Sequence, residues 1–80
     1  MIDASTATAQ RARLLDALRR GSLTTLEARR RLDVMHPAAR VMELRRLGFN
    51  IVTIWTTDVT AEGNTHRVAC YQLRQSGGTQ

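Results

Sequence analysis

The fold is decided by residues 22–49, which read SLTTLEARRRLDVMHPAARVMELRRLGF. Two short helices are predicted inside this stretch. The first runs from about Thr25 to Leu32, because Thr24-x-x-Glu27 is a capping box that starts a helix. The second runs from Pro37 to Leu47, because proline suits the first position of a helix. The four residues 33–36 form a tight connection between the two helices.

Another helix is predicted ahead of this stretch, from Ala9 to Arg20. Its apolar residues Leu14, Leu15 and Leu18 fall on one face at helical spacing. Candidate N-caps are Ser5, Thr6 and Thr8, and we expect Gly21 to end the helix in a left-handed conformation. Ser22-Leu23 is long enough only for a single-bridge strand.

After Gly48, which is expected to cap the last helix, the pattern changes to that of strands. Residues Ile51–Thr57 are β-branched almost throughout, and His66–Leu73 follow after a loop over 58–64. The loop contains Glu62-Gly63-Asn64, a turn signal. The two strands are therefore predicted to form an antiparallel hairpin. We expect one domain over 9–74, with flexible segments at 1–8 and 75–80.

Each predicted element has a face that we expect to be buried. The residues assigned to the core, besides the leucines of the first helix, are Ala28, Leu32, Ala38, Val41, Leu44, Ala69, Tyr71 and Leu73. A tryptophan in so small a domain is also most often a core or hairpin-packing residue, and we assign Trp55 to this role rather than to stacking on a base or sugar.

Length and composition exclude several classes of protein. Eighty residues bury only about 60% of the surface of the unfolded chain, so the core is thin. A large substrate pocket or a Rossmann-type sheet does not fit in such a chain. No apolar run approaches the roughly 20 residues of a membrane span, and no stretch resembles a signal peptide. We therefore expect a soluble, cytoplasmic protein.

The sequence lacks the residue patterns of an enzyme or a metal site. Cys70 is the single cysteine, so no internal disulfide can form. Together with His36 and His66 it falls short of the four ligands of a closed zinc site. On one strand, His66 and Cys70 would lie about 13 Å apart, beyond hydrogen-bond reach. We expect no catalytic activity, no metal and no cofactor, with Cys70 an inert small apolar residue.

The charge is unevenly distributed along the chain. All twelve basic residues are arginines, against seven acidic residues, for a net charge of +5. Residues 11–46 hold ten arginines and four acids, a balance of +6, whereas residues 47–80 hold two of each and balance to zero. The positive field therefore lies on the first part of the chain, where a polyanion would bind.

The order helix, short strand, helix, helix, hairpin is that of a winged helix-turn-helix, an α+β fold. Several segments resemble the small winged helix-turn-helix DNA-binding domains found in phages and prophages. They are Leu14–Leu18, Leu23–Arg29, His36–Val41, Glu43–Ile51 and Tyr71–Leu73. The resemblance covers roughly residues 11–73. It implies binding to double-stranded DNA, as a transcriptional regulator or as an accessory in replication or excision. Many such turns have glycine where this chain has Asp33, which tolerates a left-handed backbone better than most residues.

The helix over 37–47 is the candidate recognition helix in the major groove. With Ala38, Val41 and Leu44 inward, helical spacing puts His36, Ala39, Glu43 and Arg46 on the outer face, flanked by Arg40 and Met42. At least one arginine of Arg29-Arg30-Arg31 is expected to contact phosphate. The predicted DNA contacts are Thr25, Arg29, Arg30, His36, Ala39, Arg40, Glu43, Arg46 and Arg67.

Two residues of this helix have competing interpretations. Glu43 is an acid on the expected DNA face, where it could accept a hydrogen bond from cytosine, pair with Arg40 or Arg46, or repel phosphate. Arg45 lies nearer the inner side. We therefore interpret it first as a structural partner of Glu27 or of a helix carbonyl.

The tip of the hairpin is acidic, since Asp58 and Glu62 both fall in the predicted loop. Carboxylates beside a phosphate backbone are repelled, so we expect the tip to point away from DNA. The second strand would then make the contact, through Arg67 and the hydrogen-bond donors of residues 64–66.

A second function class stays open from the sequence. Winged helices also bind proteins, and a basic helix face fits an acidic protein groove as well as a phosphate backbone. The domain could thus be a protein-interaction module acting on a host or phage protein. Whether it binds as a monomer or as a homodimer is also open, because specific sites are usually read by dimers and the sequence shows no clear heptad.

Overall fold

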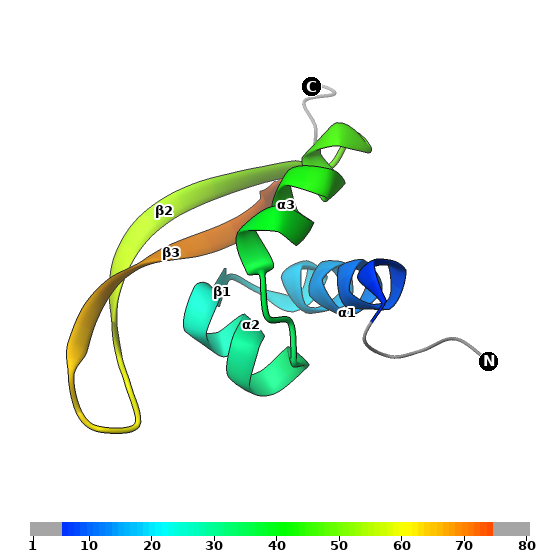
Figure 1. The fold of residues 1–80 in the computed structure, drawn as a ribbon. Coiled ribbons are helices and arrows are strands. Elements are labelled where there is room, and N and C mark those ends of the chain that lie inside the picture. The colour runs from blue at the N-terminus through cyan, green and yellow to red at the C-terminus, as the bar shows by residue number, and fades with distance from the viewer. Residues whose placement is uncertain (1–5, 75–80) are drawn as a thin grey trace.

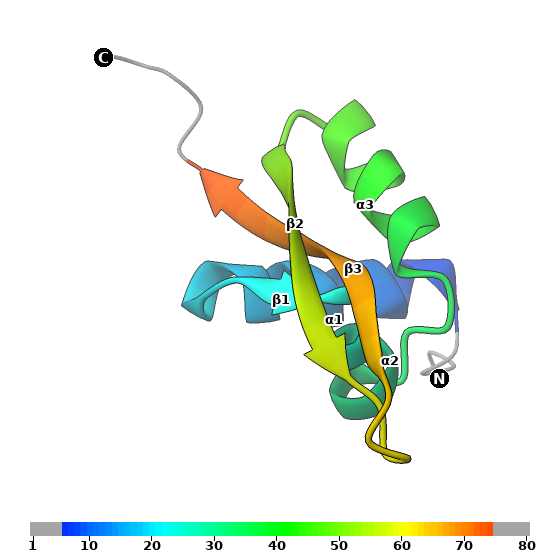
Figure 2. The ribbon, with the colours of Figure 1, turned by 90° about the vertical axis from the view of Figure 1, so that its left-hand side faces the viewer.

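A computed structural model describes residues 6–74 of the chain. Its elements, in order, are α1 (Ala7–Arg20), β1 (Leu23–Thr24), α2 (Thr25–Leu32), α3 (Pro37–Arg46), β2 (Asn50–Val59) and β3 (Thr65–Arg74). The three helices pack beside one antiparallel sheet with the strand order β1-β3-β2 (Figure 1). Seen from the sheet side, β1 lies next to β3, with α1 and α2 behind the strands (Figure 2). The predicted α+β winged helix-turn-helix is confirmed.

Helix α1 begins two residues earlier than predicted. Of the three candidate N-caps, Thr6 is the one used: its hydroxyl accepts a hydrogen bond from the N–H of Ala9 at 3.1 Å. At the other end the expectation for Gly21 was wrong, because its φ of 166° is extended backbone that any residue adopts. The expected flexible segments 1–8 and 75–80 lie outside the described residues except for Thr6–Thr8, of which 7 and 8 are helical.

The capping box at the start of α2 forms as predicted. The N–H of Glu27 donates to the Thr24 hydroxyl at 3.1 Å, and the Glu27 carboxylate accepts from the N–H of Thr24 at 2.8 Å. After Leu32, Asp33 adopts a left-handed conformation with φ 54° and ψ 41°. This lets the N–H groups of both Asp33 and Val34 reach the carbonyl of Ala28, the latter at 3.2 Å. The chain thereby reverses before α3.

Helix α3 starts at Pro37 as predicted and ends at Arg46, one residue before the predicted end. Gly48 follows with φ +105°, a conformation that favours glycine, and its N–H donates to the Arg45 carbonyl at 3.0 Å. The buried side chains of α3 are Pro37, Val41 and Leu44. Ala38, which was expected in the core, is exposed.

The hairpin is longer than predicted. Strands β2 and β3 pair continuously from Asn50 opposite Arg74 to Val59 opposite Thr65, and Gly63 (φ +88°) closes the turn. Asp58, which was expected in the loop, therefore lies in β2. The short strand β1 makes two pairs with β3 instead of a single bridge, with Leu23 opposite Tyr71 and Thr24 opposite Cys70.

The core gathers where the helices meet the sheet. It contains Leu14, Leu18, Leu23, Ala28, Val34, Val41, Leu44, Ile51, Ala69 and Tyr71. Leu15, Leu32, Phe49 and Leu73 pack against it while half-buried. Trp55 is not part of the core, since 59% of it is exposed. The far half of the hairpin arches away from the helices, so its side chains have less of the protein to pack against (Figure 1).

One carboxylate ties this arching hairpin to the start of α2. Asp58 accepts hydrogen bonds from the Thr24 hydroxyl at 3.0 Å and from the N–H of Val59 at 2.8 Å. A guanidinium nitrogen of Arg30 lies 3.8 Å away. These contacts hold the pKa of Asp58 below its ordinary value, the Val59 N–H first, then the Thr24 hydroxyl and the Arg30 charge.

This lowered pKa predicts a specific pH dependence of stability. The groups around Asp58 favour its charged form, so they stabilise the folded protein at pH values above the pKa of Asp58 in the unfolded chain, about 3.9. This stabilisation is lost as the pH falls through the lower pKa of Asp58 in the folded protein. Asp58→Asn should therefore be less stable than the wild type at pH 7, and the gap should begin to narrow as pH falls below about 4. Urea midpoints at pH 7, 5 and 3 measure it. A gap that stays constant over this range would show that the charge of Asp58 contributes nothing.

The left-handed Asp33 predicts an order of stabilities at one position. The left-handed conformation destabilises a residue that has a β-carbon by about 1–2 kcal/mol, and aspartate by less, whereas glycine adopts it without this steric cost. Asp33→Gly should be at least as stable as the wild type, and Asp33→Ala should be less stable than Asp33→Gly by about 1 kcal/mol. Thermal or urea unfolding of the three proteins gives the order. Equal stability of the glycine and alanine variants would contradict it.

Candidate nucleic-acid interface

The outer surface of α3 is small and largely apolar, with one arginine at its end. We call Ala38, Ala39, Met42 and Arg46 the α3 face; all four are exposed, Met42 by 52%. A guanidinium nitrogen of Arg46 lies 3.7 Å from the sulfur of Met42, so the two side chains are in contact. Ala39 and Arg46 thus lie where the sequence placed them. Met42, expected at the flank, belongs to the face itself.

Two residues expected on or beside this face turn toward α1 instead. A guanidinium nitrogen of Arg11 lies 2.9 Å from one oxygen of Glu43. The Nη2 of Arg40 donates to the other oxygen of Glu43 at 3.1 Å, and the Nε of Arg40 lies 2.9 Å from the oxygen that Arg11 contacts. Their side chains are only 26%, 32% and 18% exposed for Arg11, Glu43 and Arg40. Glu43 is therefore a bridge between α1 and α3, and its expected place on the outer face was wrong.

The reason is the phase of the helix. Ala38 was expected as the first inward residue, but Pro37 occupies that place. At 100° per residue, this exchange turns the centre of the buried side by about 30°. Glu43 and Arg40 move toward α1, and Met42 moves outward. The apolar residues Pro37, Val41 and Leu44, at helical spacing i, i+4 and i+7, are the sequence signal that could have set the phase correctly.

Arg45 has a structural role, as expected, with different partners. Its Nε donates to the carbonyl of Ile51 at 2.7 Å, and its Nη2 donates to the hydroxyl of Thr53 at 2.9 Å. The predicted partner Glu27 is in the capping box and lies 3.8 Å from Arg31. Arg45 thereby fixes the end of α3 to the start of β2.

The three consecutive arginines of α2 point in three directions. Arg29 donates through Nε to the carbonyl of Met35, in the turn before α3. Arg30 lies beside Asp58 of the hairpin and Arg31 beside Glu27. Thr25 is half-buried, and its hydroxyl donates to the carbonyl of Ala69 at 3.3 Å. His36, immediately before α3, is exposed.

The hairpin carries an exposed aromatic and cationic pair on the side of the sheet that begins next to α3. The guanidinium carbon of Arg67 lies 5.2 Å from the centre of the Trp55 ring, within the range of a cation–π contact. Alternate residues of a strand share one side, so Thr53, which receives the bond from Arg45, and Trp55 face the same way. Arg45, Thr53, Trp55 and Arg67 therefore form a continuous line from α3 along the hairpin.

The ion pairs divide the arginines into two groups. Arg11, Arg20, Arg30, Arg31 and Arg40 each lie within 4 Å of a carboxylate. Within residues 6–74, no carboxylate pairs in this way with the arginines that we call uncompensated, which are Arg19, Arg29, Arg45, Arg46, Arg67 and Arg74. Four of them lie around the α3 face, with Arg29 near the turn before α3, Arg45 and Arg46 at the end of α3, and Arg67 on the hairpin. Arg19 lies near the end of α1, and Arg74 lies at the end of β3. Most of the positive charge that is left over is therefore on α3, beside it and on the hairpin.

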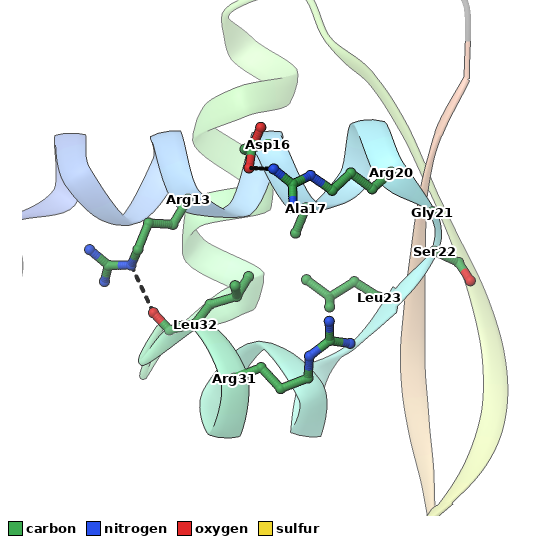
Figure 3. A pocket seen from close by; sticks show the side chains of 9 residues that line it. All are labelled: Arg13, Asp16, Ala17, Arg20, Gly21, Ser22, Leu23, Arg31 and Leu32. Carbon is green, nitrogen blue, oxygen red and sulfur yellow. Dashed lines mark hydrogen bonds and ion pairs between the residues drawn. The ribbon is translucent and has the colours of Figure 1, made fainter.

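A shallow hollow elsewhere on the molecule has the character of a structural junction. It has a volume of about 420 Å³ and lies between α1, β1 and α2 (Figure 3). Arg13 donates through Nε to the carbonyl of Leu32 at 2.8 Å, and Arg20 pairs with Asp16 at 3.2 Å. Over the described part of the chain, no three histidine, cysteine or acidic side chains are grouped as metal ligands would be. None of the helices described is long and apolar enough to cross a membrane.

Comparison with known proteins identifies the family. A family described as "Winged helix-turn-helix domain" matches residues 9–76, which is most of the chain and includes every element of the fold except the first residues of α1. Neither the search of curated proteins nor that of solved structures found a match. With its capped α2, its reversal at Asp33 and its α3 and hairpin in this order, the chain belongs to the winged helix-turn-helix domain family.

Proposed function

We propose that the protein binds double-stranded DNA in a sequence-specific manner, with α3 in the major groove. The observation that carries this proposal is the position of three uncompensated arginines, Arg29 and Arg46 beside the α3 face and Arg67 on the hairpin. An arginine that has no acid beside it keeps its full charge for a phosphate and can grip it with two hydrogen bonds. Membership of the winged helix-turn-helix domain family supports the same proposal, because this type of domain suggests DNA binding.

The α3 face also has the shape that close approach requires. Ala38 and Ala39 are in the first turns of the helix, the part of a recognition helix that contacts base edges. Their small side chains let the backbone come near the floor of the groove. Arg46, at the other end, is long enough to reach a guanine edge or a phosphate.

The remaining predicted contacts then take distinct roles. Arg29 and His36 lie beside the start of α3, where they would bind phosphate. Thr25 at the start of α2 and Arg30 in its second half would also bind phosphate. Arg67 would contact the backbone from the hairpin. Glu43, which pairs with both Arg11 and Arg40, sets the orientation of α3, so Arg40 and Glu43 act as positioning residues. In the cell we place the protein among regulators of transcription, or among accessories of replication or excision.

A protein-interaction role is the second candidate, favoured by the exposed Ile54, Trp55 and Val59 of the hairpin. A gel-shift series with a random-sequence duplex, from low to physiological salt, distinguishes the two. Each phosphate that is neutralised contributes about −0.9 to the slope of log affinity against log salt, so two to four contacts predict a slope of about −2 to −4. Absence of binding to any duplex at low salt, by a folded protein, would favour the protein partner.

Two arginine variants then separate base reading from phosphate binding on a duplex selected from a random pool. Arg46→Ala should weaken binding to the selected duplex by about 1–3 kcal/mol and binding to random DNA much less. Arg67→Ala, the matched control on the hairpin, should weaken both equally and reduce the salt slope by about one. If Arg46→Ala also weakened both duplexes equally, its contact would be to phosphate only.

A further inference from the structure

We infer that the α3 face selects T·A base pairs through the C5-methyl group of thymine, with Met42 as the specificity-determining residue. This inference rests on the proposed function and deepens it, because it names the base-edge chemistry that α3 recognises. It arises from the exposed methionine in the middle of the helix.

The fold does not require an apolar side chain at position 42. Val41 is fully buried and Leu44 nearly so, whereas Met42 is on the other side of the helix and half-exposed. The sulfur of Met42 contacts the guanidinium of Arg46. An exposed methionine gains nothing from the core, so its apolar character is available to a partner.

Apart from Arg46 at its end, the α3 face offers apolar contact and almost no hydrogen-bond readout. Ala38 and Ala39 present only methyl groups, and the sulfur of Met42 is a weak acceptor. In the major groove, thymine is the base that presents a methyl group, and apolar side chains contact it. The polar edges of the other bases would lose water against this surface without gaining a partner.

The ion pairs remove the competing readout from α3. Glu43 is the only acid of the helix, and it could accept a hydrogen bond from the amino group of cytosine. Both of its oxygens are held by Arg40, and one of them also by Arg11. What faces outward is therefore the strip Ala38-Ala39-Met42, followed by Arg46.

The test replaces thymine by deoxyuridine, which lacks only the methyl group, one position at a time in the selected duplex. At the thymine that Met42 contacts, the wild type should bind the deoxyuridine duplex about fourfold more weakly, the effect expected for one buried methyl group. Met42→Gln, of similar length but polar, should bind both duplexes equally. Met42→Leu, the matched control, should keep the preference. Because the position is exposed, circular dichroism should show all three proteins folded.

The outcomes separate this inference from the proposed function. Tight, sequence-specific binding with no loss at any deoxyuridine position would overturn the methyl readout and leave DNA binding intact. A preference that persists in Met42→Gln would assign the methyl contact to another residue and overturn the role of Met42. Absence of binding even to the unmodified duplex would overturn both proposals.

Discussion

The packing of α3 against α1 and the sheet is the constraint on which the rest of the molecule depends. Pro37, Val41 and Leu44 are buried in a core of few residues, and Glu43 is held between Arg11 of α1 and Arg40. A helix fixed by three apolar contacts and a shared carboxylate cannot turn about its axis. Its exposed side is therefore determined, and so is the surface that any partner of α3 meets.

Charge pairing has a similar effect on the arginines. Isolated surface ion pairs contribute little to stability, so the pairs of Arg20, Arg30 and Arg31 matter mainly for where charge remains. The acids neutralise arginines on α1, on the outer side of α2 and between α1 and α3. Of the described arginines without an acidic partner, four lie on α3, beside it and on the hairpin, while Arg19 lies near the end of α1 and Arg74 at the end of β3. Most of the uncompensated positive charge is therefore near α3 and the hairpin.

Local signals predicted most of the fold, and long-range contacts account for what was missed. The capping box, Pro37, Asp33 and Gly48 each act within a few residues, and the helix boundaries that they predict differ from the structure by no more than one residue. Alanine fits either side of a helix, so Ala38 gave the wrong phase. Glu43 pairs with Arg11, 32 residues away, which no local pattern shows. Trp55 packs on the hairpin against Arg67 and not in the core, because the hairpin extends beyond the helices by a length that the sequence does not reveal.

The central claim is that nucleic acid meets the protein at α3 and the hairpin. NMR spectra of the ¹⁵N-labelled protein, titrated with the selected duplex, test it residue by residue. If nucleic acid binds there, the largest shifts of backbone amide signals occur at Ala38, Ala39, Met42, Arg46 and Arg67, and the signals of the outer side of α1 are unchanged. Shifts centred on Ala12, Asp16 and Arg19 of α1, with α3 unaffected, would contradict it.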